Sequence, residues 1–261
     1  MKASLILPSF NRPGLLDLGL SSIVKNPITD PDWTLEVIVV NDGIPDETEI
    51  IANKYRAYFD VKYIFTGKRN APRIIPRVPG FAINAGVKRC TGEAIILSCP
   101  EIYHLNNALD NVLKWVRNAR VMMIPESMYF DDVGKFTEYL TRSVNYSTLE
   151  ILSSLTTGGV GHEAVQMPYL MAMMKREFVA IGGYDEDFTG YAADDNDLVD
   201  RLKDFGCEYC RMPAKIVHLY HGKRCDAQEH PENPDWVHNY NLFVQKKGQI
   251  VRNAGRQWGL G

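Results

Sequence analysis

Acidic side chains that could do chemistry are concentrated in one short part of this sequence. The group contains Asp185, Glu186 and Asp187, followed by Asp194, Asp195 and Asp197. Three acids within four residues repel one another unless a cation, a basic partner or a helix N-terminus compensates their charge. The simplest interpretation is that Asp194 or Asp195 caps a helix. Such a position also holds a carboxylate rigidly at the rim of a site, where it can serve as a general base.

Asp42 is a second carboxylate with two interpretations. It follows an apolar run in Val-Ile-Val-Val-Asn-Asp-Gly. A carboxylate at the end of a strand can accept hydrogen bonds from a nucleobase N–H or from ribose hydroxyls. An acid in Asn-Asp-Gly is equally typical of a turn that stabilises the bend between a strand and a loop. The sequence leaves both interpretations open.

Ligands for a divalent cation occur in two other segments. Glu101 follows an apolar run in Leu-Ser-Cys-Pro-Glu, and His218 and His221 lie three residues apart. Hard cations such as Mg²⁺ and Mn²⁺ prefer carboxylates and often bridge to diphosphate oxygens. We expect either imidazole to join Glu101 around such a cation.

Cysteines offer an alternative metal set. Cys207 and Cys210, together with His218 and His221, resemble the two-Cys, two-His ligands of zinc fingers. Only seven residues separate the two pairs, which is shorter than the usual spacing of about a dozen in such fingers. This spacing disfavours structural zinc.

One basic run, residues 68–77, ends at Arg77. As a solvated loop it needs no function. At the edge of a sheet, its guanidinium groups could bind a diphosphate or an anionic acceptor.

The elements that must position these residues are predicted from apolar runs that recur at intervals of roughly 25 to 35 residues, as in strand-helix-strand units. The predicted strands of the first half are residues 4–8, 35–40, 61–65, 94–97 and 121–124. The predicted helices between them are residues 15–24, 48–58 and 105–116. This order predicts an α/β fold with a mainly parallel central sheet flanked by helices. Parallel sheets bind ligands beyond the carboxyl ends of their strands. The segments directly after the predicted strands are residues 9–12, 41–43, 67–70 and 99–101.

The second half is less regular. Residues 125–166 are polar and aromatic without a clear period, and we expect them to fold over the sheet rather than extend it. A strand at 168–175, a helix at 195–205 and one or two strands at 207–219 are predicted further on. We predict a single domain over 1–261, with a first half (1–124), a second half (125–222) and a C-terminal tail (223–261).

Composition excludes several classes of protein. The 261 residues are 45% apolar and 23% charged, which disfavours disordered, fibrous and membrane-spanning chains. A formal net charge of -3 gives no global reason to expect a polyanionic partner. Five cysteines, an odd number, indicate reduced thiols. Because the first apolar run is too short for a signal or a span, we expect a cytoplasmic protein, in bacteria or a virus-infected cell, without a stable membrane anchor.

Taken in order, these motifs resemble a glycosyltransferase with the GT-A fold, and they are most similar to glycosyltransferase family 2 and its relatives, over roughly residues 2 to 222. The resemblance rests on 7–12, 39–43, 84–86 with 91–97, 182–188, and 194–198 with 201–202 and 206. It implies that 1–124 is the nucleotide-sugar-binding half and 125–222 the acceptor and catalytic half. The donor-binding residues that it implies are Pro8, Phe10, Asn11, Arg12, Asp42, Arg77, Asn84, Cys99 and Pro100. It places the family's acceptor loop at Gly183, Tyr184 and Tyr191, and its acid pair at Asp194 and Asp195, with Asp195 as the base.

Two positions depart from the family pattern. Where the family usually has Asp-x-Asp, this chain has Cys99-Pro100-Glu101, so only the second acid is matched. The family's Glu-Asp pair appears as Asp194-Asp195, which keeps both charges. Metal binding through Glu101, with His218 or His221, is therefore expected from one carboxylate instead of two.

The resemblance implies transfer of a sugar from a nucleotide-diphosphate sugar to an acceptor hydroxyl. It implies assistance by Mn²⁺ or Mg²⁺, a UDP-sugar as the favoured donor and inversion at the anomeric carbon, while guanosine and thymidine donors and retention stay open. The acceptor is unknown: a saccharide or, less in keeping with the net charge, modified nucleic acid. Its binding is expected in 127–166 and in the tail. The aromatic candidates there and nearby are Tyr129, Phe130, Tyr139, Tyr146, Tyr169 and Trp236.

Two other functions compete with this one. A non-catalytic module that binds nucleotide sugars could have kept the fold and lost turnover, and Cys99 in place of an acid favours it. A sugar nucleotidyltransferase also uses an α/β sheet with metal-held phosphates. Its Gly-rich, Arg-containing segment is absent after the first strand, where Pro-Ser-Phe-Asn stands instead. The oligomeric state is not encoded in any pattern that we can recognise.

Overall fold

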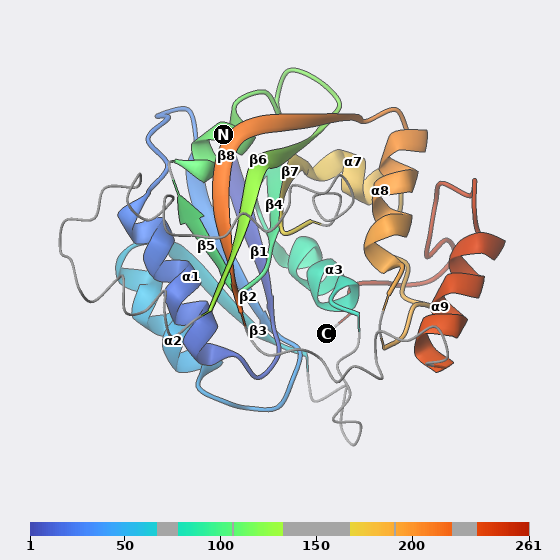
Figure 1. Cartoon of the computed structure of the whole chain (residues 1–261), viewed down its shortest axis with the longest axis horizontal. Helices are drawn as coiled ribbons and strands as arrows, with labels where there is room; N and C mark the ends of the chain where they lie inside the picture. The colour runs from blue at the N-terminus through green and yellow to red at the C-terminus, as the bar shows by residue number, and fades with distance from the viewer. Residues whose placement is uncertain (67–77, 106, 133–167, 191, 221–233, 261) are drawn as a thin grey trace.

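A mixed sheet of eight strands forms the centre of the computed structural model, which describes all residues except 67–77, 106, 133–167, 191, 221–233 and 261 (Figure 1). The strand order is β3-β2-β1-β4-β7-β6-β8-β5. The strands are β1 (Lys2–Ser9), β2 (Thr34–Asn41), β3 (Asp60–Phe65), β4 (Ala94–Ser98), β5 (Ile102–Leu105), β6 (Val121–Asp132), β7 (Leu170–Met174) and β8 (Glu208–Tyr220).

Strand direction divides the sheet into two parts. The neighbours β3, β2, β1 and β4 are all parallel. β7 is antiparallel to both β4 and β6, β6 is parallel to β8, and β5 is antiparallel to β8. The parallel layer predicted for the first half is therefore confirmed for β1 to β4, while β5 and β7 run antiparallel to their neighbours.

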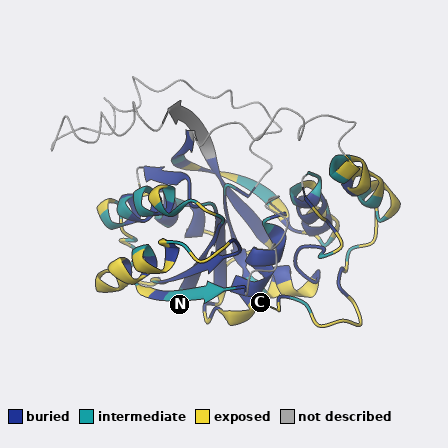
Figure 2. Cartoon of the chain, turned by 90° about the horizontal axis from the view of Figure 1, so that it is seen from below, coloured by how far each residue is buried: buried dark blue, intermediate teal, exposed yellow. Residues whose placement is uncertain are grey.

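Helices cover both faces of the sheet (Figures 1 and 2). The helices are α1 (Pro13–Lys25), α2 (Thr48–Lys54), the 3₁₀ turn η1 (Tyr55–Ala57), α3 (Gly80–Arg89), α4 (Ala108–Leu113), α7 (Lys175–Ala180), α8 (Asp194–Asp204) and α9 (Pro234–Gln245). Apolar side chains of α1, α2 and α4 share one buried cluster with one face of the sheet. Those of α3, α7 and α8 share a second cluster with the other face. None of the described helices combines the length and apolar character that a membrane span requires.

Several sequence expectations need correction. β6 continues to Asp132 in parallel pairing with β8, so residues 125–132 extend the sheet instead of folding over it. Residues 208–220 form one strand, β8. The predicted helix 105–116 is shorter than expected: α4 covers only residues 108–113 and follows the short strand β5. The sequence did not predict α3, whose two glycines depress helix propensity, or α9 within the supposed tail.

The parallel strands end together at one edge of the sheet. Ser9 at the end of β1 pairs with Asn41 at the end of β2, and Ile6 pairs with Leu97 near the end of β4. The loops that follow these three strands therefore start side by side. This edge is where a parallel sheet is expected to bind a ligand.

A buried carboxylate joins β2 to its neighbours near the opposite edge. Glu36 is fully buried and accepts hydrogen bonds from the Ser4 hydroxyl (2.6 Å), the Lys62 ammonium (2.7 Å) and the Thr91 hydroxyl (2.7 Å). Burial raises its pKa, but these donors outweigh burial and hold the pKa at about 2. Glu36 thus belongs to the scaffold and stays charged.

Candidate active site

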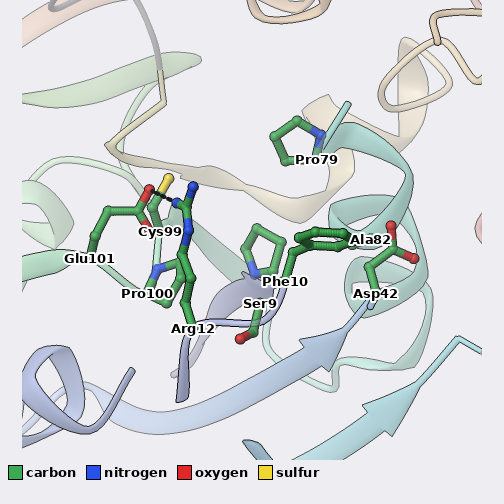
Figure 3. Close-up of a pocket in the computed structure, with 10 residues that line it drawn as sticks. Ser9, Phe10, Arg12, Asp42, Pro79, Ala82, Cys99, Pro100 and Glu101 are labelled. Atoms are coloured by element: carbon green, nitrogen blue, oxygen red, sulfur yellow. Dashed lines mark hydrogen bonds and ion pairs between the residues drawn. The ribbon is translucent and has the colours of Figure 1, made fainter. Parts of the chain in front are cut away.

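A cleft of about 550 Å³ opens at the carboxyl edge of β1, β2 and β4 (Figure 3). The cleft is lined by Pro8, Ser9, Phe10, Arg12, Asp42, Pro79, Ala82, Cys99, Pro100 and Glu101. Six predicted donor-binding residues and the predicted metal ligand Glu101 are therefore brought together by strands that lie far apart in the sequence.

Asp42 stands at one end of this cleft. It is buried, and its Oδ1 accepts a hydrogen bond of 2.7 Å from the Thr66 hydroxyl. The turn that follows β2 is built by Asn41, whose Oδ1 accepts from the Gly43 N–H (3.0 Å) and whose amide donates to the Ile44 carbonyl (3.1 Å). Because Asn41 supplies the turn chemistry, the turn does not explain the Asp42 carboxylate, which lines the cleft.

The loop after β1 crosses the middle of the cleft. The Phe10 ring lies between Asp42 on one side and Arg12 on the other (Figure 3). Asn11 is exposed, has a positive φ of 53° and does not line the cleft. An ideal Cβ atom placed on Gly43 would lie only 2.7 Å from Asn11 Oδ1. The Asn11 side chain therefore packs against the turn after β2 and helps to hold the loop after β1 in place.

Glu101 stands at the other end of the cleft. Its Oε1 lies 2.9 Å from Arg12 Nη1 and 3.9 Å from His218 Nε2. β5 and β8 bring the imidazole here, because Ile102 pairs with His218 across the two strands. The Tyr169 ring packs edge-on against the imidazole, with centroids 5.2 Å apart.

The cation expected from the family can be tested against these side chains. Within the described part of the chain, no three His, Cys, Asp or Glu residues form a group that could hold a metal ion. Glu101 and His218 offer two ligands close together. Two protein ligands suit a cation that takes its other ligands from water and substrate phosphates, as Mg²⁺ often does. His221 lies outside the described residues.

The alternative zinc set is wrong. Cys210 and His218 lie on the same strand, β8, eight residues apart. An extended strand advances about 3.3 Å per residue, so these two residues are roughly 26 Å apart. They cannot share one ion.

The acid pair begins helix α8. The residue at the N-cap is Ala193, with a positive φ of 68°, and no side chain caps the helix. Asp194 and Asp195 lie in the first turn, so the expectation that one of them caps the helix is wrong. Asp194 is buried, whereas Asp195 is half-buried and its Oδ1 accepts a hydrogen bond of 2.7 Å from the Tyr184 hydroxyl.

Tyr184 connects the acids to the cleft. Its ring is fully buried, and burial followed by the charges of Asp195 and Asp194 raises its pKa well above the usual 10. The hydroxyl therefore stays protonated and donates to Asp195. The Tyr184 ring packs against Gly80, where an ideal Cβ would lie 2.4 Å from Cδ1, and Gly80 directly follows the cleft residue Pro79.

Asn84 and Gly183 position Tyr184 and do not line the cleft. The Asn84 amide donates to the Tyr184 carbonyl (2.9 Å), and its Oδ1 accepts from the Tyr184 N–H (2.9 Å). Gly183 has a positive φ of 67°, and an ideal Cβ there would lie 2.5 Å from Asn84 Oδ1. Only glycine fits this close approach without strain. Arg77, Tyr191 and His221 lie outside the described residues.

The other acids are neutralised by the C-terminal segment, which sequence analysis did not connect to the site. Asp197 accepts from Arg201 Nε and Arg252 Nη2, both at 2.7 Å. Lys246 Nζ lies 2.6 Å from both Asp185 and Asp187. The repulsion among the clustered acids had predicted basic partners. The basic residues of the supposed tail were the sequence signal that could have identified those partners.

The same segment also builds the loop that carries Tyr184. The Asn253 amide donates to the carbonyls of Gly182 (2.8 Å) and Tyr184 (2.7 Å). The Arg252 N–H donates to the Ile181 carbonyl at 2.9 Å. The segment after α9 is therefore part of the structure that supports the candidate site.

Comparison with known protein families shows to which family the chain belongs. The sequence profile described as "Glycosyl transferase family 2" matches residues 4–180. The chain belongs to glycosyltransferase family 2. A second profile, described as "N-terminal domain of galactosyltransferase", matches residues 169–224, the part that carries Tyr184 and the acid pair. The family match thus covers the cleft and stops before the acids.

Two curated relatives are themselves glycosyltransferases. Dolichyl-phosphate beta-glucosyltransferase from Homo sapiens is 32% identical over 123 residues, which cover 43% of this chain and 37% of the relative. Validoxylamine A glucosyltransferase from Streptomyces hygroscopicus subsp. limoneus is 23% identical over 236 residues, which cover 78% of this chain and 48% of the relative. The family 2 chain therefore spans less than half the length of each of these relatives.

Solved structures confirm the GT-A fold. Mannosyltransferase PcManGT from Pyrobaculum calidifontis, in complex with GDP-Man and Mn²⁺, has a TM-score of 0.60 at 15% identity, covering 93% of this chain and 64% of that chain. TarS 1-349 from S. aureus, in complex with UDP-GlcNAc, has a TM-score of 0.61 at 14% identity, covering 97% and 69%. At these identities the likeness shows the fold alone.

Proposed function

We propose that this family 2 chain transfers a sugar from a nucleoside diphosphate sugar to a hydroxyl of an acceptor, with Asp195 as the base. The observation that carries the proposal is the position of Asp195. Its carboxylate accepts from the buried Tyr184, whose ring packs against Gly80, and Gly80 directly follows Pro79 in the lining of a cleft that has a carboxylate at each end. A binding module needs the cleft, but it has no need of a rigidly held carboxylate next to it.

The donor is proposed to lie along the cleft. Asp42 binds the nucleoside, Phe10 offers a ring face to base or sugar, and the diphosphate extends toward Arg12 and Glu101. Helix α1 begins at Pro13, directly after Arg12, and has no acid in its first turn. Its positive end favours the anionic diphosphate.

Chemistry is proposed to occur where the diphosphate end of the cleft meets Tyr184. The acceptor oxygen attacks the anomeric carbon as the bond from that carbon to the diphosphate oxygen breaks, and the acceptor proton passes to Asp195. Tyr184 holds the carboxylate in place by donating to Oδ1. A single displacement of this kind inverts the anomeric carbon, which we propose for this chain.

A divalent cation, Mn²⁺ or Mg²⁺, is proposed to be held by Glu101 and His218. When bound, it stabilises the negative charge that develops on the leaving diphosphate. PcManGT is described with Mn²⁺ and GDP-Man, and TarS with UDP-GlcNAc, which supports a cation and a nucleotide sugar but leaves the base open. A UDP-sugar, a saccharide acceptor and a cytosolic location remain our predictions.

Donor binding provides the direct test. Calorimetric titration with UDP, GDP and their sugars, with and without Mn²⁺, is expected to show one nucleotide that binds more tightly with the metal. Absence of binding by every nucleotide under both conditions would contradict the proposed function. A nucleotidyltransferase would instead form a nucleotide sugar from a nucleoside triphosphate and a sugar phosphate, which can be assayed in parallel.

Asp42→Asn is expected to weaken binding of the preferred nucleotide by about 10 to 100-fold, because a hydrogen bond to a charged group contributes about 1.5–3 kcal/mol. The change is isosteric, and the dissociation constant measures it. Asp60→Asn is the matched control, since it removes the same charge from an exposed ion pair with Lys2 at the opposite edge of the sheet. Equal affinities for the two variants would contradict the role of Asp42.

Tyr184→Phe is expected to move the acidic limb of the kcat/KM profile to higher pH by about one unit, because the Asp195 carboxylate loses a donor that stabilises its charged form. At pH values below the acidic limb, kcat/KM of the variant is therefore about tenfold lower than that of wild type. At pH values above the limb, kcat/KM is close to that of wild type. Tyr103→Phe is the control, because Tyr103 is also buried but its hydroxyl contacts Lys25 away from the acids. An unshifted profile in Tyr184→Phe would remove Tyr184 from the mechanism.

A further inference from the structure

Two opposite charges meet where the cation is proposed to bind. Arg12 Nη1 lies 2.9 Å from Glu101 Oε1, along the dashed line in Figure 3. The two side chains are 26% and 8% exposed, so water screens the contact only partly. His218 Nε2 lies 3.9 Å from the same oxygen. The carboxylate oxygen next to the imidazole is thus the one that the guanidinium contacts.

The guanidinium and a divalent cation compete for this oxygen. Both are positive, and two like charges this close together repel each other in a partly buried site. A cation that binds Glu101 and His218 must therefore displace the guanidinium or leave it without an anion. A diphosphate in the cleft removes that penalty, because it can take the planar guanidinium in a bidentate contact.

The position of Arg12 permits such an exchange. Arg12 is the last residue before α1, with φ of -136° and ψ of 47°, outside the helical region. The side chain is partly exposed and lines the cleft. The first turn of α1 contains no acid that could take the guanidinium instead of a ligand.

We propose that Arg12 is a positioning residue that changes partner during the binding of donor. It holds Glu101 while the cleft lacks a donor, and it moves to the diphosphate when the nucleotide and the cation enter together. This inference rests on the proposed function and adds a property to it. The protein binds the cation weakly by itself, and nucleotide and cation strengthen each other's binding by one common factor, as thermodynamic linkage requires.

Binding of Mn²⁺ tests the exchange without any turnover. Free Mn²⁺ is measured by electron paramagnetic resonance as it is titrated into the protein alone and with saturating UDP or GDP. For Arg12→Gln we expect binding of Mn²⁺ alone to tighten about tenfold, because the competing guanidinium is gone. The factor by which the nucleotide tightens Mn²⁺ binding is expected to fall about tenfold as well.

Two further variants make the result specific. Arg117→Gln removes the same charge from an exposed ion pair with Asp32 and is expected to leave both constants unchanged. In a Glu101→Gln background, Arg12→Gln is expected to have no effect on binding of Mn²⁺ alone. A tenfold effect that persists there would show that Arg12 repels the cation through another group and would overturn the exchange.

Failure of the exchange differs from failure of the proposed function. If the wild-type protein binds UDP or GDP with Mn²⁺, but Arg12→Gln binds Mn²⁺ alone as weakly as wild type does, the exchange is wrong and the proposed function survives. If the wild-type protein binds neither nucleotide at any Mn²⁺ concentration, the proposed function fails and the exchange fails with it.

Discussion

Asp195→Asn is expected to lower kcat by about 10³-fold, because an amide cannot accept the acceptor proton and general-base catalysis contributes about 10²- to 10⁴-fold. The substitution keeps the size of the side chain and an oxygen that can accept from the Tyr184 hydroxyl. Donor affinity and the melting temperature are therefore expected to stay near those of wild type. Turnover with the donor and acceptor, together with nucleotide binding measured separately, checks both expectations.

Helix α8 supplies its own control for this experiment. Asp204 ends the helix on the exposed surface, and Asp204→Asn removes the same charge without touching Tyr184. Its kcat is expected to equal that of wild type. A loss of activity in Asp204→Asn as large as that in Asp195→Asn would attribute the effect to helix charge and not to the base. If wild type, Asp195→Asn and Asp204→Asn all hydrolyse the donor at the same low rate, the result would favour the non-catalytic module.

Asp197→Asn is expected to destabilise the protein by about 3–5 kcal/mol, because it breaks a buried charge network and leaves guanidinium groups without compensation. Asp197 holds Arg201 and Arg252 at 2.7 Å each, and all three side chains are at most 3% exposed. For a chain of this size the melting temperature is expected to fall by roughly 6–15 °C. Thermal unfolding followed by circular dichroism measures the shift.

The same network offers a second variant and a control. Arg252→Gln is expected to be destabilising by a similar amount, since it removes the partner shared by Asp197 and Asp185, which lies 3.0 Å from Arg252 Nε. Arg256 also pairs with an acid, Asp187, but both side chains are at least 40% exposed. Arg256→Gln is therefore expected to change stability by less than about 1 kcal/mol. Equal shifts for Arg252→Gln and Arg256→Gln would show that burial does not decide the strength of these pairs.

Asp195 and Asp197 were indistinguishable members of one acidic group in the sequence. The tertiary structure separates them, because Asp195 accepts from Tyr184 whereas Asp197 accepts from Arg252 in the C-terminal segment. Burial and partners make Asp197 a structural residue and leave Asp195 for the role of base that we propose. No spacing rule within residues 194–197 could have made this distinction, because the partners come from positions up to 55 residues away.

Local patterns were enough to predict the strands of the parallel layer and the residues that follow them. Apolar runs specify buried strands, and parallel strands end at one edge, so the loops with Phe10, Asp42 and Glu101 could be expected to meet. The β6–β8 pairing, α3 and α9 could not be predicted in this way. They depend on contacts between distant segments that override weak local propensity.

By itself, the sequence determined the chemistry that is available: a cleft at the ends of parallel strands, an acid pair at a helix start, and a single carboxylate where the family usually has two. Only the tertiary structure decided how those groups are arranged. It assigned the turn after β2 to Asn41 and left Asp42 in the cleft, and it placed Arg12 against Glu101. The physical reason is that charge and hydrogen bonding act over a few ångströms in space, whatever the separation along the chain.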